Sequence, residues 1–454
     1  MMDGMMFDVP EGEPGPAAEG EGSGSRARVR RPDRMQMSWQ AVHLDGLLPP
    51  EHRARAVWAF VDRLDLSALY AKVKAVEDHQ GRPAIDPAIL LALWLYATAE
   101  GVGSARAVAR LTVEHVAYRW LCGGVGVNHH ALSDFRVVHG EVLDRLLTQS
   151  VAVLMDQGVV ELQRVAQDGV RVRASAGSSS FRRRSRLERF LEEAGEQVRQ
   201  LKKELAEDPA ATTRREEAAR TRAAEERQAR VEEALRELAE LEEKKRAEFE
   251  ERQRAGRRDE GKLRASTTDR DARVMKMADG GFRPAFNVQL ATDTKSQVIV
   301  GVDVSNQGTD GGAMPPMLDQ IEKRHGRRPH EVLVDGGFAV RKDIEAASRG
   351  PKPCVVYAPV LKPMNPTRDP YVPCQGDSEE IAAWRIRMGT AAAKEIYKER
   401  AATAECVNAL ARNRGLRQFL VRGLKKVKAV ALLFALTHNM MRTWAFPPKT
   451  ALAS

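Results

Sequence analysis

Residues 332–340 read VLVDGGFAV, and this stretch decides how the whole chain is interpreted. Three aliphatic residues typical of a buried strand end in an acid, Asp335, and two glycines follow at once. An ionised carboxylate is costly to bury unless a cation compensates it. The glycines permit a sharp exit from the strand and a close approach of other groups. Asp335 is therefore either a simple strand-end acid in a turn or part of a site.

A second acid, Asp168, stands in a similar setting within VAQDGVRVRA, residues 165–174. Side chains alternate along a strand, so Asp168 shares its face with apolar residues while polar ones lie opposite. The apolar face carries Ala166, Val170, Val172 and Ala174, and the opposite face carries Gln167, Arg171 and Arg173. Alone, Asp168 could be a turn acid before Gly169. Two acids on separate strands of one sheet can, however, meet at neighbouring strand ends, and their oxygens suit Mg²⁺ or Mn²⁺.

A third acid, Glu405, lies in a segment with helical character, YKERAATAECVNALARNRG, residues 397–415. Tyr397 lies eight residues before Glu405 and Arg412 seven residues after it, so the spacing predicts all three on one helix face. Such a helix would offer a metal ligand between groups that hold phosphate. A solvated helix with ordinary charges is the alternative, and Glu395 and Glu399 are rival acids that the spacing disfavours.

Composition narrows the class of protein. The chain has 454 residues, a net charge of +9 and a pI near 9.4, which indicate two or three domains and a polyanionic partner, most often nucleic acid. Its four cysteines are scattered, with no zinc or disulfide pattern, as expected in a reducing setting. We find no signal-peptide pattern and no apolar run that could span a membrane, and expect a cytoplasmic protein.

The order of elements predicts the fold class. We expect a strand near Asp168, an insertion, two strands over residues 286–306, and then alternating helices and strands. This is the order of an α/β RNase H-like catalytic domain with a helical-hairpin insertion, preceded by an all-α N-terminal domain. The predicted parts are a disordered tail, 1–35; the helical domain, 36–158; the catalytic domain, 159–180 and 262–446; the charged hairpin, 181–261; and a tail, 447–454.

In the N-terminal domain, Asp86 and Pro87 predict a helix start and Gly101 its end, and Ser104 caps a second, short helix. The short helices after Ser104 could form a helix-turn-helix whose phosphate-contacting residues would be Arg106, Arg110 and Arg119. An ordinary helical bundle with exposed arginines is equally consistent. The adjacent pair His129 and His130 has too few ligands nearby for a metal site, so we interpret it as structural or DNA-adjacent.

Residues 181–260 carry 22 Lys/Arg and 22 Asp/Glu, so this segment has no net charge. Apolar residues recur at three- and four-residue spacing before and after Asp208–Pro209, which predicts two amphipathic helices joined there. We favour pairing of these helices within one chain over a dimerising coiled coil.

The C-terminal part is basic, and no Asp or Glu follows Glu405. Such a run is usually a phosphate-contacting face. The DNA-contact candidates here are Arg412, Arg414, Arg417, Arg422, Lys425, Lys426 and Lys428, and the weaker ones elsewhere are Arg173 and Lys276.

These residues resemble the DDE transposases of bacterial insertion sequences, over nearly the whole chain beyond the first tail. In that family one Asp follows the first strand, a second follows a later strand and a Glu lies on a C-terminal helix, which Asp168, Asp335 and Glu405 match. The family's helix signature is matched by Tyr397, Arg400, Glu405 and Arg412, with one extra residue before Glu405 and Arg in place of the more usual Lys. Residues 104–124 and 129–140 are similar to the family's helical N-terminal domain.

The resemblance implies a chemistry and partners. Asp168, Asp335 and Glu405 would hold two Mg²⁺ or Mn²⁺ ions that cut a phosphodiester at the element's end and transfer the freed end to a target. Tyr397 and Arg400 would contact DNA. The implied partners are double-stranded element ends and target DNA, bound by a dimer or larger assembly at the bacterial nucleoid. The alternatives are a non-catalytic DNA-binding derivative, an RNase H-like nuclease of repair or defence and, least favoured, a coiled-coil scaffold.

Overall fold

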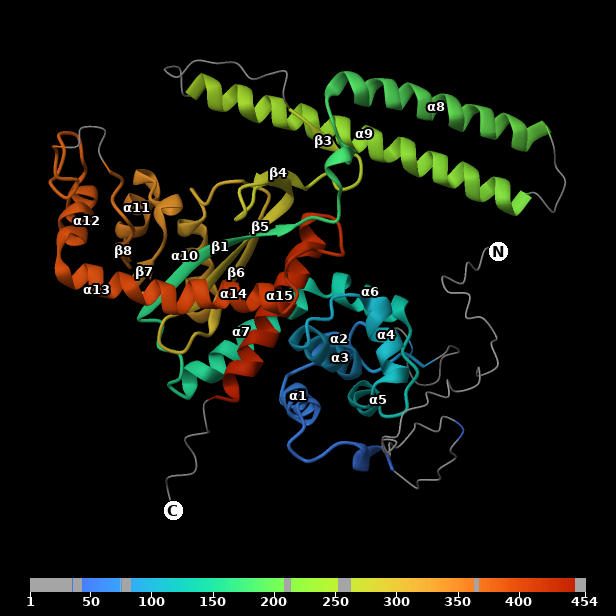
Figure 1. The fold of residues 1–454 in the computed structure, drawn as a ribbon, viewed down its shortest axis with the longest axis horizontal. Helices are drawn as coiled ribbons and strands as arrows, with labels where there is room; N and C mark the ends of the chain where they lie inside the picture. Colours follow the sequence, from blue (N-terminus) through green and yellow to red (C-terminus); the bar gives the residue numbers. More distant parts are fainter. Residues whose placement is uncertain are drawn as a thin grey trace, which may run out of the picture. The chain divides into compact units, whose positions relative to one another are not determined.

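The computed structural model describes Met35 and residues 43–73, 75, 83–207, 214–251, 263–362 and 367–445. The predicted tails, 1–35 and 447–454, lie outside these residues apart from Met35, as does the predicted turn at Asp208–Pro209. From Leu44 onward the chain forms one compact unit, to which all the elements below belong (Figure 1).

The N-terminal part is helical, as predicted. Asp86 caps its central helix by accepting a hydrogen bond of 2.8 Å from Ala88 N, and Ser104 caps the next by accepting from Ala107 N at 3.3 Å. The central helix is apolar on nearly all sides, and it is buried for that reason. The elements are η1 (Leu44–Leu47), α1 (Arg53–Asp62), α2 (Ser67–Tyr70), α3 (Pro87–Ala99), α4 (Ala105–Glu114), α5 (Val116–Cys122), α6 (His129–Val138) and α7 (Gly140–Asp156).

A mixed six-stranded sheet follows. Its strands are β1 (Arg164–Arg173), β4 (Arg273–Lys276), β5 (Phe282–Asp293), β6 (Ile299–Ser305), β7 (Glu331–Leu333) and β8 (Val355–Tyr357). Strand β5 pairs antiparallel with β4, β6 and β1, and β1 pairs parallel with β7, which pairs parallel with β8. Helix α10 (Met314–His325) leads from β6 to β7, and η4 (Gly336–Phe338) and α11 (Arg341–Ser348) lead from β7 to its parallel neighbour β8.

The C-terminal helices complete the body of the protein. They are α12 (Glu379–Gly389), α13 (Ala391–Arg400), a π-helical turn η5 (Ala401–Glu405), α14 (Cys406–Asn413) and α15 (Leu424–Thr443). Helix α15 is tied to the edge of β6, because the Asn439 side chain accepts from Ile299 N and donates to Ile299 O, both at 2.8 Å. One apolar core therefore runs from the N-terminal helices through α15 to the face of β1 and β5 that carries Val170 and Val172.

The charged segment forms the predicted helical hairpin, made of α8 (Arg184–Glu207) and α9 (Arg214–Glu251). Ion pairs Arg184–Glu242 at 2.5 Å and Lys202–Glu225 at 2.8 Å show that the helices run antiparallel. Their apolar seam includes Leu187, Val231 and Leu238, so the predicted pairing within one chain is confirmed.

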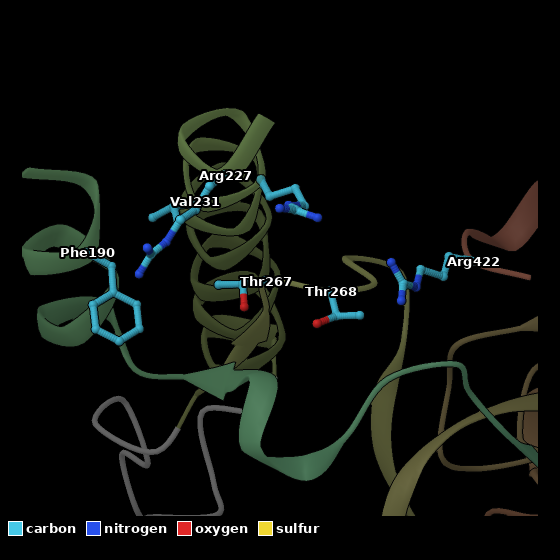
Figure 2. A pocket seen from close by; sticks show the side chains of 7 residues that line it. Phe190, Arg227, Val231, Thr267, Thr268 and Arg422 are labelled. Atoms are coloured by element: carbon cyan, nitrogen blue, oxygen red, sulfur yellow. The ribbon is translucent and has the colours of Figure 1, made fainter. Parts of the chain in front are cut away.

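The hairpin begins and ends at a two-stranded ribbon of β2 (Phe181–Arg182) and β3 (Ala265–Ser266), which η2 (Ser178–Ser180) precedes. Ion pairs from Arg270 to Glu233, at 2.6 Å, and from Arg273 to Glu237 fasten α9 to the segment that leads into the sheet. A pocket of about 340 Å³ lies at this base of the hairpin (Figure 2).

Within the described residues, none of the helices combines the length and the apolar character needed to cross a lipid bilayer.

Candidate functional site

Asp168 and Asp335 occupy matching positions on two neighbouring parallel strands. Ala166 of β1 pairs with Leu333 of β7, and each acid lies two residues further along its own chain. Because parallel strands advance together, this register brings the two acids side by side where β7 ends. Strand β1 continues to Arg173 along β5, so Asp168 lies within its strand and does not follow it, unlike the family pattern expected from the sequence.

Of the two glycines after Asp335, Gly337 has the close approach of other groups that the sequence indicated, whereas a Cβ atom on Gly336 would meet nothing within 4 Å. The Asp335 carboxylate accepts a hydrogen bond of 2.8 Å from Gly337 N and so caps the short helix η4. A Cβ atom on Gly337 would lie 3.0 Å from Asp335 Oδ1 and 3.3 Å from Oδ2 of another acid, Asp310. A larger residue would therefore crowd both carboxylates.

Glu405 reaches the same place because of the π-turn η5, which takes up the extra residue of the helix signature. In a regular α-helix, residues five apart are turned about 140° from each other around the axis, and residues four apart only about 40°. The widened turn lets Arg400 Nη1 donate to Glu405 Oε1 at 2.7 Å across five residues. The rival acids lie elsewhere: Glu395 pairs with Lys398 at 2.7 Å, and Glu399 pairs with Arg164 at 2.5 Å.

Arg400 is the centre of the cluster. Its guanidinium contacts Asp168 Oδ2 at 3.1 Å, Asp335 Oδ2 at 3.8 Å and Glu405 Oε1 at 2.7 Å. The side chain of Arg400 is 11% exposed, whereas those of Asp168, Asp335 and Glu405 are 14%, 38% and 56% exposed. The cluster therefore opens from a buried acid, Asp168, toward solvent at Glu405.

The electrostatics of the cluster follow from this burial. Burial raises the pKa of Asp168; the positive charge of Arg400 opposes this rise, and the negative charges of Asp335 and Asp310 add to it. Burial also raises the pKa of Tyr397, and Asp335, Glu405 and Asp168 add to that rise against Arg400. The Tyr397 hydroxyl is thus within electrostatic reach of all three acids.

Asn408, on α14, also belongs to the cluster. Its Nδ2 donates to Asp168 Oδ2 at 3.0 Å, so the acid is held from the helix side by both Asn408 and Arg400. This residue was not predicted from the sequence, although it lies one helical turn beyond Glu405 within the signature helix. Among the described residues, Asn408 Oδ1 and Arg400 Nε are buried and have no hydrogen-bond partner. Beside the acids, one acceptor and one donor are therefore free to bind a further polar group.

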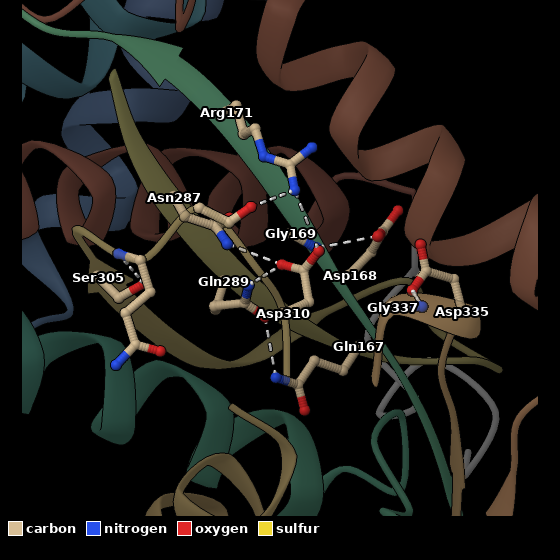
Figure 3. Close-up of polar contacts among 12 residues, drawn as sticks. Gln167, Asp168, Gly169, Arg171, Asn287, Gln289, Ser305, Asp310, Asp335 and Gly337 are labelled. Atoms are coloured by element: carbon tan, nitrogen blue, oxygen red, sulfur yellow. Dashed lines mark hydrogen bonds and ion pairs between the residues drawn. The ribbon is translucent and has the colours of Figure 1, made fainter. Parts of the chain in front are cut away.

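A fourth carboxylate, Asp310, lies on the other face of β1 (Figure 3). Its Oδ1 accepts from Asn287 Nδ2 and from Gln289 Nε2, both at 2.7 Å, and Arg171 Nη2 lies 3.6 Å from its Oδ2. A Cβ atom on Gly169 would meet Gln289 Nε2 at 2.6 Å and Asp310 Oδ1 closer still. The sequence signal for this network was two amides, Asn287 and Gln289, on one face of an otherwise apolar central strand.

The predicted DNA-contact residues fall into two groups. Arg173, Lys276, Arg412, Arg417, Arg422, Lys425 and Lys426 have exposed side chains. Arg173 lies beside the C-terminal basic segment, since Arg173 N donates to Arg417 O at 3.1 Å and Phe419 N donates to Arg173 O at 2.8 Å. Arg414 and Lys428 are half-buried, with Arg414 Nη1 3.3 Å from His438 Nδ1 and Lys428 Nζ donating to Asp303 Oδ1 at 2.8 Å, and Arg400 is buried among the acids.

The predicted helix-turn-helix of the N-terminal domain would be formed by α4 and α5. His115 alone joins α4 to α5, which is shorter than the three- or four-residue turn of a DNA-binding helix-turn-helix. The side chains of Arg106, Arg110 and Arg119 are exposed, so the helices are confirmed and the motif remains a prediction. The rings of His129 and His130 lie against each other, 4.0 Å between centroids, at the start of α6.

The donor set fits a hard divalent cation. Three carboxylates from a strand, a strand end and a helix face one another across a single guanidinium, and oxygen donors of this kind bind Mg²⁺ or Mn²⁺. Within the described ranges, no three acidic, His or Cys side chains have the spacing of a ready-made metal site. The three acids fit as ligands of a divalent cation because their donor atoms are oxygens and because they lie together. In this structure Arg400 forms the ion pairs with them.

Two family comparisons match the chain. Residues 42–137 match a family described as a transposase domain (DUF772), and residues 375–444 match a family described as a transposase DDE domain. The second match contains Glu405 and the signature helix; Asp168 and Asp335 lie outside both matches. Comparisons with curated proteins and with solved structures gave no match.

The two matched segments are both transposase domains, one at each end of the described chain. Both matches support the class that the sequence predicted, a DDE transposase of an insertion sequence.

Proposed function

We propose that this transposase binds the ends of its insertion sequence, cuts the DNA there and transfers the freed 3′ end to a target. Asp168, Asp335 and Glu405 would hold two Mg²⁺ or Mn²⁺ ions. The observation that carries the proposal is the convergence of these three acids on Arg400 from separate elements. When bound, such ions activate water or a DNA 3′-hydroxyl and stabilise the departing oxygen.

The strand order supports an RNase H-like fold for the catalytic part. Strands β6, β5 and β1 form an antiparallel meander, and β7 and β8 are added parallel to β1 on its other side. In this arrangement the acid on the central strand β1 adjoins the acid at the end of β7. Both are supplied by one sheet, and the C-terminal helices supply the third.

Arg400 and Asn408 are proposed as positioning residues. Asn408 fixes one oxygen of Asp168, and the single positive charge of Arg400 offsets part of the negative charge of the three acids before a metal ion binds. Because Asp168 is buried and its pKa is raised, ligation by its ionised form requires a cation beside it. Tyr397 would position DNA near the acids and serves as no nucleophile in this scheme.

The DNA surface is proposed to lie along the exposed basic residues around Arg173 and Arg417, which the backbone holds side by side. After Glu405 the chain has no acid to offset them, so phosphate contacts there are electrostatically favourable. The proposed setting is the nucleoid in the bacterial cytoplasm, with a dimer or larger assembly on paired ends.

The test uses purified full-length protein, Mg²⁺ or Mn²⁺, and labelled duplexes taken from the regions flanking the gene. Asp168→Asn, Asp335→Asn and Glu405→Gln should each abolish cleavage, and Glu399→Gln is the matched control that should retain it. Cleavage at one fixed position followed by joining to a plasmid supports the proposal. Cleavage without a fixed position or joining would favour a nuclease, and binding without cleavage would favour a non-catalytic derivative.

A further inference from the structure

The pocket at the base of the hairpin is built from segments far apart in the sequence (Figure 2). Helix α8 contributes Phe190, helix α9 contributes Arg227, Arg230 and Val231, the loop after β3 contributes Thr267 and Thr268, and the segment before α15 contributes Arg422. Its lining thus combines three guanidinium groups and two hydroxyl groups with no carboxylate. This composition is that of an anion-binding site.

Two of the three arginines that line the pocket have no partner, although the hairpin as a whole is neutral. Arg227 and Arg230 are exposed and form no hydrogen bond or ion pair with any described residue. Elsewhere on the hairpin some arginines pair with glutamates, as Arg184 does with Glu242 and Glu188, and others outside the pocket, such as Arg199 and Arg236, have no partner among the described residues. The pocket is distinguished by bringing three arginines together, two of them without a partner, where the hairpin meets the body of the protein.

Neighbouring groups strengthen this concentration. The guanidinium groups of Arg182, Arg186 and Arg189 lie 6.0, 5.6 and 5.9 Å from the ring centroid of Phe190, which lines the pocket. The nearby acids Asp269 and Asp271 accept hydrogen bonds from Gly423 N at 3.2 Å and Leu424 N at 2.7 Å; the charge of Asp269 offsets part of that of Arg422, and Asp271 pairs with Arg270 at 3.4 Å. The pocket therefore faces solvent with a surplus of positive charge.

The pocket is continuous with the proposed DNA surface. Arg422 both lines the pocket and donates from Nε to Ser175 O at 3.2 Å, two residues beyond Arg173. Arg417, Lys425 and Lys426, all exposed, lie within five residues of Arg422 in the chain. A polyanion that follows this surface would meet the hairpin at Arg227 and Arg230.

We infer that the hairpin is a DNA-contacting arm whose base grips phosphates of the duplex backbone between Arg227, Arg230 and Arg422. The Thr268 hydroxyl is the neutral donor in the same pocket, since that of Thr267 donates to Ser180 O at 3.4 Å. The inference rests on the proposed function, because it takes DNA as the polyanion. It also gives the insertion, which contributes none of the three acids, a role in holding the substrate.

The experiment measures the equilibrium association of full-length protein with a labelled element-end duplex and with a scrambled duplex, over a series of NaCl concentrations. The variants are Arg227→Gln/Arg230→Gln and Arg422→Gln. The control is Arg199→Gln/Arg236→Gln, which removes the same charge from exposed hairpin arginines that lie outside the pocket. Circular dichroism melts establish that all variants fold.

The slope of log K against log[NaCl] is expected to become shallower by about 0.9 for each phosphate that the protein no longer neutralises, hence by about 1.8 in the double pocket variant. The change should be the same on both duplexes, because phosphate contacts carry no sequence information. The control should keep the wild-type slope.

A double pocket variant with the slope of the control would overturn the inference. So would a variant that binds DNA normally but loses thermal stabilisation by inorganic phosphate, or loses binding of poly-glutamate; the pocket would then serve a small anion or an acidic protein segment. Failure of the proposed function looks different: the wild type itself would neither bind nor cut the element-end duplex.

Discussion

Arg400→Gln is expected to lower the free energy of unfolding by about 3 kcal/mol in metal-free buffer. Removing one partner from a buried ion pair costs about 3–5 kcal/mol, because the remaining charge is left buried without compensation. The low end applies here, since only Asp168 is deeply buried; Asp335 is 3.8 Å from the guanidinium and Glu405 is more than half exposed, so their pairs contribute little.

Divalent metal should restore much of this stability. The variant leaves three carboxylates facing one another without a cation, so Mg²⁺ or Mn²⁺ meets less competition there than in the wild type. A ligand present at about 100 times its Kd stabilises the folded state by about 2.7 kcal/mol. Urea denaturation, followed by circular dichroism with EDTA or with Mg²⁺, measures both numbers.

Arg385→Gln is the matched control, because Arg385 donates from Nε to the buried Asp377 at 2.8 Å and contacts none of the three acids. It should lose less stability than Arg400→Gln, because Arg341 also forms an ion pair with Asp377, and it should recover none of that stability with metal. Equal stability of metal-free Arg400→Gln and the wild type would refute the prediction, as would equal stabilisation of both variants by Mg²⁺.

Three further predictions concern the surroundings of the site. Gly169→Ala should disturb the Asp310 network, cost about 1–3 kcal/mol of stability and reduce DNA cleavage. The control Gly177→Ala, whose Cβ would meet nothing closer than 3.5 Å, should leave stability and cleavage unchanged in denaturation and cleavage assays. Deleting Ala402 should convert the π-turn to a regular turn and keep Glu405 within about 40° of Arg400 around the helix axis, so that DNA cleavage survives. Deleting Ala409, which is also exposed but lies in a regular helix, would turn all following residues by about 100° and should abolish cleavage. Burial lowers the pKa of His438 from 6.5 to about 4, so between these pH values the unfolded chain binds more protons than the folded one, and the free energy of unfolding should fall by about 3 kcal/mol as the pH drops from 6.5 to 4. In urea titrations, His438→Gln should flatten this part of the pH profile. A stability difference between variant and wild type that does not change with pH would count against the prediction.

The acids were predictable because each carries a local signal. Asp335 ends an aliphatic run and precedes two glycines, and Asp168 interrupts an apolar strand face. Their meeting could be expected from strand ends in general, but the register that joins Ala166 to Leu333 is set by long-range pairing between residues 167 apart in the chain. That β1 continues past Asp168 depends in the same way on its partner β5.

Other parts of the site lack such a signal. Asp310 lies in a loop after β6, in a sequence whose polar and glycine residues predict only a turn; its partners Asn287 and Gln289 belong to another segment. The extra residue before Glu405 was visible in the sequence, yet helical periodicity alone does not say whether a helix absorbs it as a π-turn or changes phase. The π-turn is accompanied by contacts that a sequence does not show: Arg400 contacts Glu405 and Asp168, and the Thr403 hydroxyl donates to Glu399 O.

The cluster depends on two independent alignments that meet at one interface. Strand register fixes the two aspartates relative to each other, and the phase of the helical run α13–η5–α14 fixes Arg400, Glu405 and Asn408. The two sets are joined where Arg400 and Asn408 both contact the same oxygen of Asp168. A change that shifts the helices relative to β1 would therefore separate Glu405 from the aspartates without altering any acid. Asp168, the most buried of the three, is for this reason the residue through which sheet and helix are held in the geometry that catalysis would need.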